Sequence, residues 1–281
     1  MTTIESTFVN YAVKLDTSNG VLHVTLNRPK ALNSMTREYF RETAALFTAI
    51  SGDQRVRCVL LSAAGRMFSC GLDLKDAGAS LTGGSSGDEP ETGELGQLWR
   101  GVAQMQRGFK AVEDCSKPIV TAIHGQCIGG ALELVLATDV RFCCADALFS
   151  VRETKMAIVA DLGMLHRLVR QCGRAWVNLM ALTGADVTAA DAKAAGVVSH
   201  VFATHDELMA RALETAKAIA ANSPATVQGV KHVLAFSAEH NPADSLAYVA
   251  LWNAAFLRND DLTEAIASFV QRRQPQFNAR L

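Results

Sequence analysis

The chain has 281 residues, of which 49% are hydrophobic and 20% charged, a composition typical of a soluble globular protein with a sizeable core. Its formal net charge of -1 provides no basic field, so we expect no nucleic-acid partner, and no apolar run is long enough to span a bilayer. The N-terminal residues match neither a signal peptide nor an Arg-rich presequence, so we expect no leader and no membrane contact.

Strands and helices alternate along the first half of the chain. Two β runs, 11–16 and 21–27, flank a loop that ends in the turn-forming pair Asn19-Gly20, which predicts a hairpin. The pattern then predicts a helix over 35–50, a buried strand over 56–63, a helix over about 98–113, a strand over 118–123, a short helix over 129–138 and a strand over 140–144. This alternation predicts an α/β core whose strands are mostly parallel.

Residues 77–96 interrupt this alternation with a Gly- and Ser-rich, acidic segment that has almost nothing to bury. We expect a mobile loop there. A lid over a site and a simple surface insertion are both compatible with this composition.

The chain becomes helical after residue 204. Proline at the first helical position predicts helix starts at Ser223-Pro224 and Asn241-Pro242, and Asp260-Asp261 provide acidic residues at another start. Four helices are predicted, over 205–222, 224–239, 242–257 and 261–272. We therefore divide the chain into a core, 1–204, and a helical region, 205–281, of the kind often used for oligomer contacts.

Two glycine-containing segments each lead out of a predicted strand. They are GRMFSCGLDL, residues 65–74, and HGQCIGGALEL, residues 124–134. Glycine permits tight turns that leave backbone N–H groups unpaired, and a strand–glycine–helix junction directs helix N-terminal amides at an anionic group. The spacing of a phosphate-binding loop is absent. Each glycine alone predicts a simple turn, but two amide-exposing turns together are what an oxyanion hole requires.

Three acids lie in otherwise apolar stretches. Glu133 follows the second glycine segment, and ETKMAIVADLG places Glu153 and Asp161 at the two ends of an apolar run. Asp161 could cap a helix that starts at Leu162, and Glu153 could be a solvated charge at a strand end. Acids in apolar surroundings are costly unless they are hydrogen-bonded or functional, so a catalytic role competes with these structural interpretations.

The cysteines indicate a reducing compartment. There are seven of them, an odd number, and no C-x-x-C pair suggests a zinc or redox site, so we expect neither a metal nor a disulfide framework. Most lie in apolar runs, where a thiol behaves as a small hydrophobe. Cys70 is a weak candidate for a nucleophile because no histidine is placed nearby in the sequence to activate it.

The sequence resembles the crotonase (enoyl-CoA hydratase/isomerase) superfamily along essentially its whole length. The motifs that carry the resemblance are LNRPKALNSM, GRMFSCGLDL, KPIVTAIHGQCIGGALEL, ATDVRFCCADALFSVRE and ANSPATVQGVK. The resemblance implies a spiral of ββα units, a helical C-terminal region that builds homotrimers or hexamers, and acyl-CoA thioester substrates. It implies no cofactor, because CoA is part of the substrate and carboxylates with an oxyanion hole suffice for proton transfer.

The resemblance also assigns site residues. The two backbone amides that hold the thioester oxygen are those of Leu72 and Gly130. The loop that lines the CoA path implies substrate contacts from Cys70, Gly71, Leu72, Asp73 and Gly130, and residues 28–32 lie near the CoA end.

The acids separate the reactions within the superfamily. Glu133 and Glu153, 20 residues apart, match the pair of a 2-enoyl-CoA hydratase. Asp161 stands where those hydratases have glycine, and the third acid resembles the Δ3,5-Δ2,4-dienoyl-CoA isomerases, as does the segment 245–262. We expect a dienoyl-CoA isomerase of fatty-acid β-oxidation. Those isomerases usually carry Asp at position 133, so hydration by Glu133 and Glu153 is the alternative, and a non-enzymatic scaffold is the third.

The expected isomerisation removes a proton from C2 of the acyl chain and adds one at C6. Two acids separated by an apolar run can serve both ends of this shift. We expect Glu153 to work at C2 and Asp161 at C6, with the reverse assignment open.

The chain ends in Ala279-Arg280-Leu281, which resembles the S-K-L peroxisomal signal. We expect a peroxisome or a related organelle, or the cytoplasm if the source is bacterial.

Overall fold

The computed structural model describes residues 3–81 and 92–278. Its main sheet has six strands in the order β1-β2-β3-β4-β6-β9. The predicted hairpin is confirmed, since β1 and β2 pair antiparallel, and the remaining neighbours pair parallel. The strand bounds are Tyr11–Asp16 (β1), Val21–Leu26 (β2), Cys58–Ala63 (β3), Ile119–Ile123 (β4), Val140–Cys144 (β6) and His200–Phe202 (β9).

A smaller sheet lies beside the main one and was not predicted. It contains β5 (Gln126–Ile128), β7 (Leu148–Ser150) and β8 (Asp186–Thr188) in that order. Its strands have three residues each, too short to show a period-2 pattern in the sequence. A bridge between Ser69 and Cys127 joins this sheet to the loop that follows β3.

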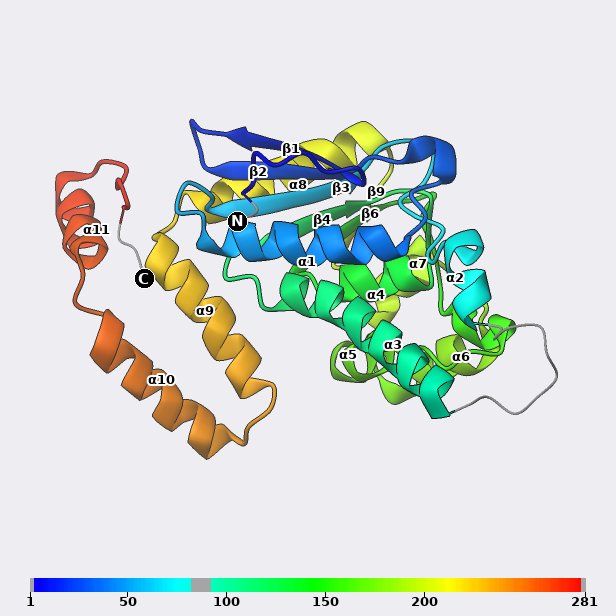
Figure 1. Cartoon of the computed structure of the whole chain (residues 1–281). Coiled ribbons are helices and arrows are strands. Elements are labelled where there is room, and N and C mark those ends of the chain that lie inside the picture. Colours follow the sequence, from blue (N-terminus) through cyan, green and yellow to red (C-terminus); the bar gives the residue numbers. More distant parts are fainter. Residues whose placement is uncertain (1–2, 82–91, 279–281) are drawn as a thin grey trace.

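Helices cover both faces of the main sheet (Figure 1). On one face lie α1 (Arg37–Gly52) and α3 (Thr92–Glu113), and on the other lies α8 (His205–Ala220). Every residue of β3 is buried, and its side chains alternate between the two faces: Leu61 joins the cluster with α1 and α3, and Leu60 joins the cluster with α8. The continuous apolar run of this strand follows from its being covered on both sides.

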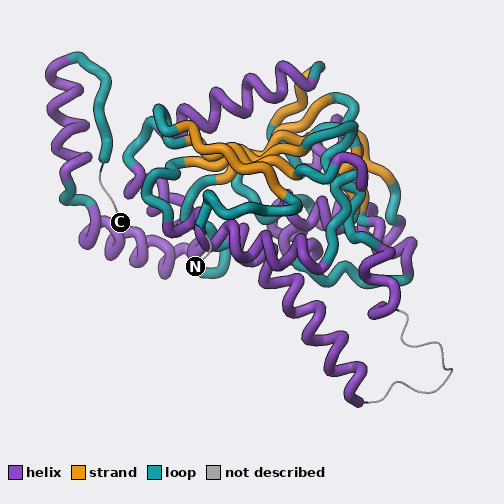
Figure 2. The backbone as a smooth tube through the Cα atoms, turned by 45° about the horizontal axis from the view of Figure 1, so that its top comes forward, coloured by secondary structure: helices purple, strands orange, loops and turns teal. Residues whose placement is uncertain are grey.

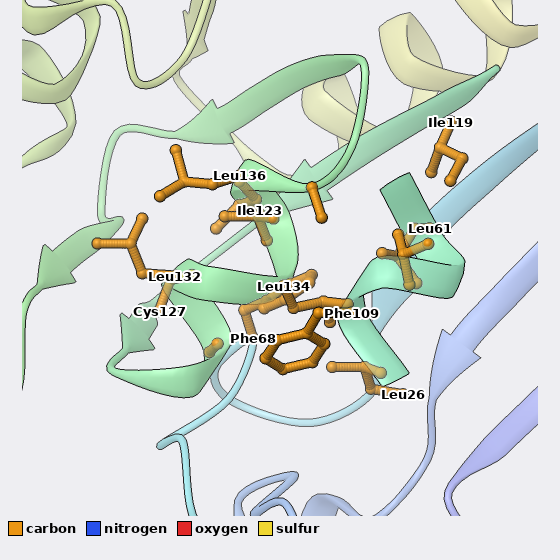
Figure 3. Packing of buried hydrophobic residues seen from close by; sticks show 14 of the residues in the cluster. Leu26, Leu61, Phe68, Phe109, Ile119, Ile123, Cys127, Leu132, Leu134 and Leu136 are labelled. Carbon is orange, nitrogen blue, oxygen red and sulfur yellow. The ribbon is translucent and has the colours of Figure 1, made fainter. Parts of the chain in front are cut away.

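The helix α4 (Gly130–Leu136) is buried over its whole length. In Figure 3 its Leu134 lies among Phe109 of α3, Ile123 of β4 and Leu61 of β3, all of the same hydrophobic cluster. A rigid α4 matters for function because its N-terminal residue is Gly130.

The last three helices form an arm that extends from the body (Figures 1 and 2). They are α9 (Pro224–Ser237), α10 (Pro242–Phe256) and α11 (Asp260–Gln271), and the side chains of Ser223, Asn241 and Asn259 cap them. The predicted helix starts are therefore confirmed. The preceding α8 lies within the predicted C-terminal region 205–281, yet it packs on the sheet.

Some predicted bounds were wrong. Helix α3 begins at Thr92, about two turns before the predicted start, and α2 (Leu74–Leu81) occupies the beginning of the segment expected to be a loop. The rest of that segment, 82–91, lies outside the described residues. The other helices are η1 (Pro29–Ala31), η2 (Arg152–Met156), α5 (Met164–Gln171), α6 (Arg174–Thr183) and α7 (Ala189–Ala195). None of the helices in 3–81 and 92–278 is long and apolar enough to cross a membrane.

Candidate active site

In the loop after β3, the N–H of Leu72 points away from the side on which the adjacent residues form hydrogen bonds. Met35 N–H donates to Gly71 O at 2.8 Å, and Asp73 N–H donates to Met35 O at 2.9 Å. These bonds flank Leu72, so its own N–H points to the opposite side of the chain. Gly71 has φ +84°, and a Cβ at this position would lie 2.5 Å from Ile128 O. The loop therefore requires glycine for both its conformation and its close approach to the second glycine segment.

The second glycine segment brings another free amide to the same place. Gly129, with φ +55°, is the N-cap of α4, and its carbonyl accepts the Glu133 N–H at 3.1 Å. Gly130 is the first residue of the helix, where the N–H has no intrahelical acceptor. A Cβ added to Gly130 would lie 3.9 Å from Leu72 N. Within the described chain neither amide has an acceptor, so two N–H groups are available for one oxygen atom.

Two polar side chains that were not predicted from the sequence hold this loop in shape. Asn33 Nδ2 donates to the carbonyl oxygens of Ala64, Met67 and Phe68, at 2.9, 3.3 and 3.0 Å. Ser69 Oγ donates to Asn33 O and accepts the Gly71 N–H. Both side chains are buried. The only signal in the sequence is a polar residue inside each of two family motifs, LNRPKALNSM and GRMFSCGLDL.

Glu133 is 1% exposed and lies at the junction of α4 and α5. Its Oε1 accepts the N–H groups of Leu162 and Met164, at 3.2 and 3.4 Å. Burial raises the pKa of Glu133 to about 8; repulsion by the Glu153 and Asp161 carboxylates adds to this, and the two amide hydrogen bonds oppose it. Glu133 is therefore mainly protonated at neutral pH, and its carbonyl-type oxygen still accepts both amides.

Glu153 lies directly beside the oxyanion-hole glycines. A Cβ added to Gly129 would be 3.0 Å from Glu153 Oε1. Its Oε2 is buried and has no hydrogen-bond partner, a costly state for a purely structural carboxylate. Glu153 lies in η2, half-buried, so the interpretation as a solvated charge at a strand end is wrong. Burial raises the pKa of Glu153, and the charge of Asp161 raises it further.

Asp161 lies near the other two acids but at the exposed end of the group. Its backbone oxygen accepts a hydrogen bond from Gln106 Nε2 at 2.6 Å. The helix cap expected for Asp161 is wrong, because α5 begins at Met164 and Gly163 is its N-cap. Partial burial raises the pKa of the Asp161 carboxyl.

The remaining predicted site residues have structural contacts of their own. Asp73 accepts a hydrogen bond from Ser34 Oγ at 2.7 Å and amide hydrogen bonds at the start of α2, and it lies 3.9 Å from the Arg28 guanidinium. These contacts lower its pKa, so it is an ionised capping residue. Cys70 is half-buried beside it, and burial raises the pKa of its thiol, which disfavours a thiolate nucleophile. The side chains described in 3–81 and 92–278 form no three-ligand metal cluster.

The assembled group is a pair of amides without acceptors in the described chain, with acids beside it, an arrangement suited to an oxyanion hole. Repulsion by the Glu153 and Asp161 carboxylates contributes to the raised pKa of Glu133, and repulsion by Asp161 contributes to that of Glu153, which places the three within electrostatic reach of one another. Carboxyl groups with raised pKa values next to two preorganised amides suit proton transfer at a carbon adjacent to a carbonyl.

Comparison with known proteins identifies the family. Residues 16–280 match the family described as enoyl-CoA hydratase/isomerase. A mitochondrial Δ3,5-Δ2,4-dienoyl-CoA isomerase from Dictyostelium discoideum is 38% identical, covering 94% of this chain and 89% of the relative. A peroxisomal Δ3,5-Δ2,4-dienoyl-CoA isomerase from Arabidopsis thaliana is 39% identical, covering 98% and 99%.

Solved structures share the fold. An enoyl-CoA hydratase from Bacillus anthracis superposes with a TM-score of 0.86 at 27% identity, covering 96% of this chain and all of that one. A family match over most of the chain, near-complete coverage of relatives and a common fold lead to one conclusion. The chain belongs to the enoyl-CoA hydratase/isomerase family, the crotonase superfamily that its motifs resemble.

Proposed function

We propose that the protein is a Δ3,5-Δ2,4-dienoyl-CoA isomerase. The observation that carries the proposal is that Glu153 lies against the glycine turn that precedes the Gly130 amide, with a second acid, Asp161, within electrostatic reach of Glu153. The two relatives that bear this name support it, since each aligns over most of the chain.

The reaction follows from the order of these groups. The thioester oxygen accepts hydrogen bonds from the Leu72 and Gly130 amides, which stabilise the negative charge that develops when C2 loses a proton. Glu153, against Gly129, takes that proton. The electron pair delocalises from C2 to C6, and the carboxyl group of Asp161 donates a proton to C6. The C3 and C5 double bonds become C2 and C4 double bonds. Glu153 then releases its proton to solvent and Asp161 takes one up, which restores both groups for the next turnover.

The raised pKa values favour this exchange. Proton transfer is most efficient when the pKa of the catalytic group lies near the working pH. Burial raises the pKa of both Glu153 and Asp161, which makes each ionised form a stronger base and keeps each acid form present closer to neutrality. Each amide of an oxyanion hole contributes about 3 kcal/mol of transition-state stabilisation.

Hydration by Glu133 and Glu153 is the second candidate function. A hydratase needs Glu133 to act on water, but here one oxygen of Glu133 is already occupied by the amides of Leu162 and Met164. The acid therefore supports α5, and this contact favours isomerisation over hydration.

Two assays on wild type and Asp161→Asn test the proposal. Wild type should convert a 3,5-dienoyl-CoA into a 2,4-dienoyl-CoA, measured as new absorbance from conjugation with the thioester. Asp161→Asn should lose at least about 10³-fold in kcat because an amide neither donates nor accepts the C6 proton. Asp206→Asn, an exposed change on α8, should have no effect. Rapid hydration of crotonyl-CoA without isomerisation would overturn the proposal.

The arm supports a proposal about assembly. Leu246 and Leu251 of α10 are 72% and 66% exposed, and α9, α10 and α11 line a mainly apolar cavity of about 830 Å³. Exposed apolar faces of this kind are typical of oligomer interfaces, so we propose a homotrimer or a hexamer of two trimers. Leu246→Glu with Leu251→Glu should lower the mass measured by light scattering, and Ala194→Glu on α7 should not. An unchanged mass would contradict an interface on α10.

The C-terminal tripeptide supports a proposal about location. Ala279-Arg280-Leu281 lies outside the described residues, and we propose that it directs the protein to peroxisomes. A fluorescent protein that carries the last residues of the chain should enter peroxisomes of a eukaryotic cell, and removal of Leu281 should leave it in the cytosol. Cytosolic fluorescence in both cases would favour the cytoplasmic alternative.

A further inference from the structure

The backbone that carries Asp161 is held by side chains from three helices. Gln106 of α3 donates to Asp161 O, and Glu133 of α4 accepts the N–H groups of Leu162 and Met164. Arg167 of α5 donates from Nη1 to Leu162 O at 3.1 Å. Side chains thus bind four polar backbone groups of the short segment 161–164, where a regular strand or helix would use backbone.

Arg167 is the most buried cation in this arrangement, with 4% exposure. Its Nη2 and Nε donate to the two oxygens of Glu113, at 2.9 and 3.3 Å. Burial alone would raise the pKa of Glu113, but the hydrogen bond and charge of Arg167 lower it overall, so the pair is ionised. A Cβ on Gly163 would lie 2.2 Å from Arg167 Nη1. Gly163 is therefore the residue that allows the guanidinium to reach Leu162 O.

The contacts from α3 come from a single face of that helix. Gln106 and Glu113 are seven residues apart, two helical turns, so both face the segment 161–167. Gln106 donates directly to Asp161 O. Glu113 binds Arg167, which in turn donates to Leu162 O. The same helix packs on α1. The segment is thus tied to a rigid part of the core.

The Asp161 side chain contrasts with its backbone. No other residue in the described chain donates a hydrogen bond to its carboxyl group, and position 161 is exposed. A carboxylate that is free to accept and donate a proton depends on its backbone for placement. An offset of about 1 Å at a reacting group costs on the order of 10²-fold in rate.

We propose that Arg167 and Gln106 are positioning residues for Asp161, acting through the carbonyls of Leu162 and Asp161 with Glu113 as the counter-ion. The inference rests on the proposed isomerase activity. Neither side chain contacts the substrate in this scheme. They fix the carboxyl group at the C6 end of the acyl chain and leave Glu153 and the oxyanion hole unchanged.

The test separates the two half-reactions. Isomerisation requires Glu153 and Asp161, whereas exchange of the substrate C2 proton in D₂O, followed by NMR, requires the oxyanion hole and the acid at C2. Asp161→Asn and Glu153→Gln are measured first, and their two patterns define which acid works at C2. Arg167→Met, Arg167→Lys and Gln106→Ala are then compared with these patterns.

Arg167→Met should lower kcat for isomerisation by about 10²-fold and Gln106→Ala by about 5- to 10-fold, each with the exchange pattern of Asp161→Asn and little change in KM. Arg167→Lys should recover part of the rate, because an ammonium can still reach Glu113 or Leu162 O. The matched controls are Arg170→Met, exposed on α5 and paired with Glu239, and Gln104→Ala, exposed on α3; both should keep wild-type rates.

The proposal would be overturned if the variants kept wild-type kcat, or if isomerisation and C2 exchange fell in parallel where Asp161→Asn separates them. If Arg167→Met does not fold, the exposed Gln106→Ala decides by the same criteria. An inactive wild type would contradict the proposed function instead, so the two failures are distinguishable.

Discussion

The oxyanion hole and the acid-bearing segment are built by opposite means. In the proposed hole, the hydrogen-bond donors are the backbone amides of Leu72 and Gly130, and glycine conformation places them. In the segment 153–164, the proposed catalytic groups are side chains, and other side chains hold the backbone of 161–164. The difference shows that the hole depends on glycine conformation and close approach, whereas the acid segment depends on a hydrogen-bond network that spans three helices.

Among the residues that build the proposed hole, the largest expected effect is at Gly71. Gly71→Ala places a methyl group 2.5 Å from Ile128 O at a residue with φ +84°, so the Leu72 amide must move. We expect kcat/KM for isomerisation to fall by about 10²- to 10³-fold. Gly101→Ala in α3, where an added Cβ meets nothing within 4 Å, is the control and should keep full activity. Near-normal activity of Gly71→Ala would mean that the backbone does not form the hole.

Glu133 joins the two regions and gives a pH-dependent prediction. Its folded pKa of about 8 lies above the ordinary value of 4.5, so the native state binds more protons than the unfolded state between these values. Wild type therefore loses stability as pH rises through this window. Glu133→Gln removes this loss and keeps the acceptor for both amides, so at pH 8 it should be more stable by up to a few kcal/mol.

Thermal unfolding at pH 5 and pH 8 measures this difference. The midpoints of wild type and Glu133→Gln should be similar at pH 5 and should separate at pH 8, with the variant higher. Glu38→Gln, an exposed change on α1, should shift neither midpoint. A variant that is less stable at pH 8 would mean that Glu133 is ionised and stabilising in the native state.

Asn33 tests how far the backbone-built hole itself depends on a side chain. Asn33→Ala removes the donor that three carbonyls share, and we expect a loss of about 2 kcal/mol in the free energy of unfolding. Chemical denaturation measures it. Asn222→Ala, which removes one exposed hydrogen bond to Ala218 O, should cost less than about 0.5 kcal/mol. Equal losses would show that the Asn33 contacts add no stability of their own.

The smallest expected effect is at Leu72. Its backbone amide is the proposed donor to the thioester oxygen, and its side chain is only half-buried. Leu72→Ala keeps the backbone, so kcat should change by about threefold or less. The comparison with Gly71→Ala is direct, because the two residues are adjacent. A loss as large as that of Gly71→Ala would assign the function to the leucine side chain and contradict the role proposed for its backbone amide.

The sequence alone predicted the parts whose cause is local. The hairpin, the buried strands and the capped helices of the arm have short-range signals, such as Asn19-Gly20 and Ser223-Pro224, and all are found close to the expected positions. The start of α3 was misplaced because Gly- and acid-rich composition outweighed helical periodicity in 92–97. The three-residue strands of the smaller sheet were missed because they are held by pairing with distant strands.

The candidate site shows the same limit. Gly71, Gly130 and the three acids could be selected from motif and spacing. The roles of Asn33, Gln106 and Arg167 could not, because each acts on backbone atoms that are distant in sequence or hidden in an irregular turn. Glu133 could be selected as a site residue from the sequence, but its hydrogen bonds to the backbone at the start of α5 could not be predicted.

The hydrogen bonds that hold the backbone at position 161 also have a consequence for how this enzyme could acquire a different reaction. Because its contacts to the rest of the protein run through main-chain atoms, the side chain can be exchanged without rebuilding the loop. A single substitution at position 161 can thus change the catalytic group, while the side chains of α3, α4 and α5 keep the backbone in place.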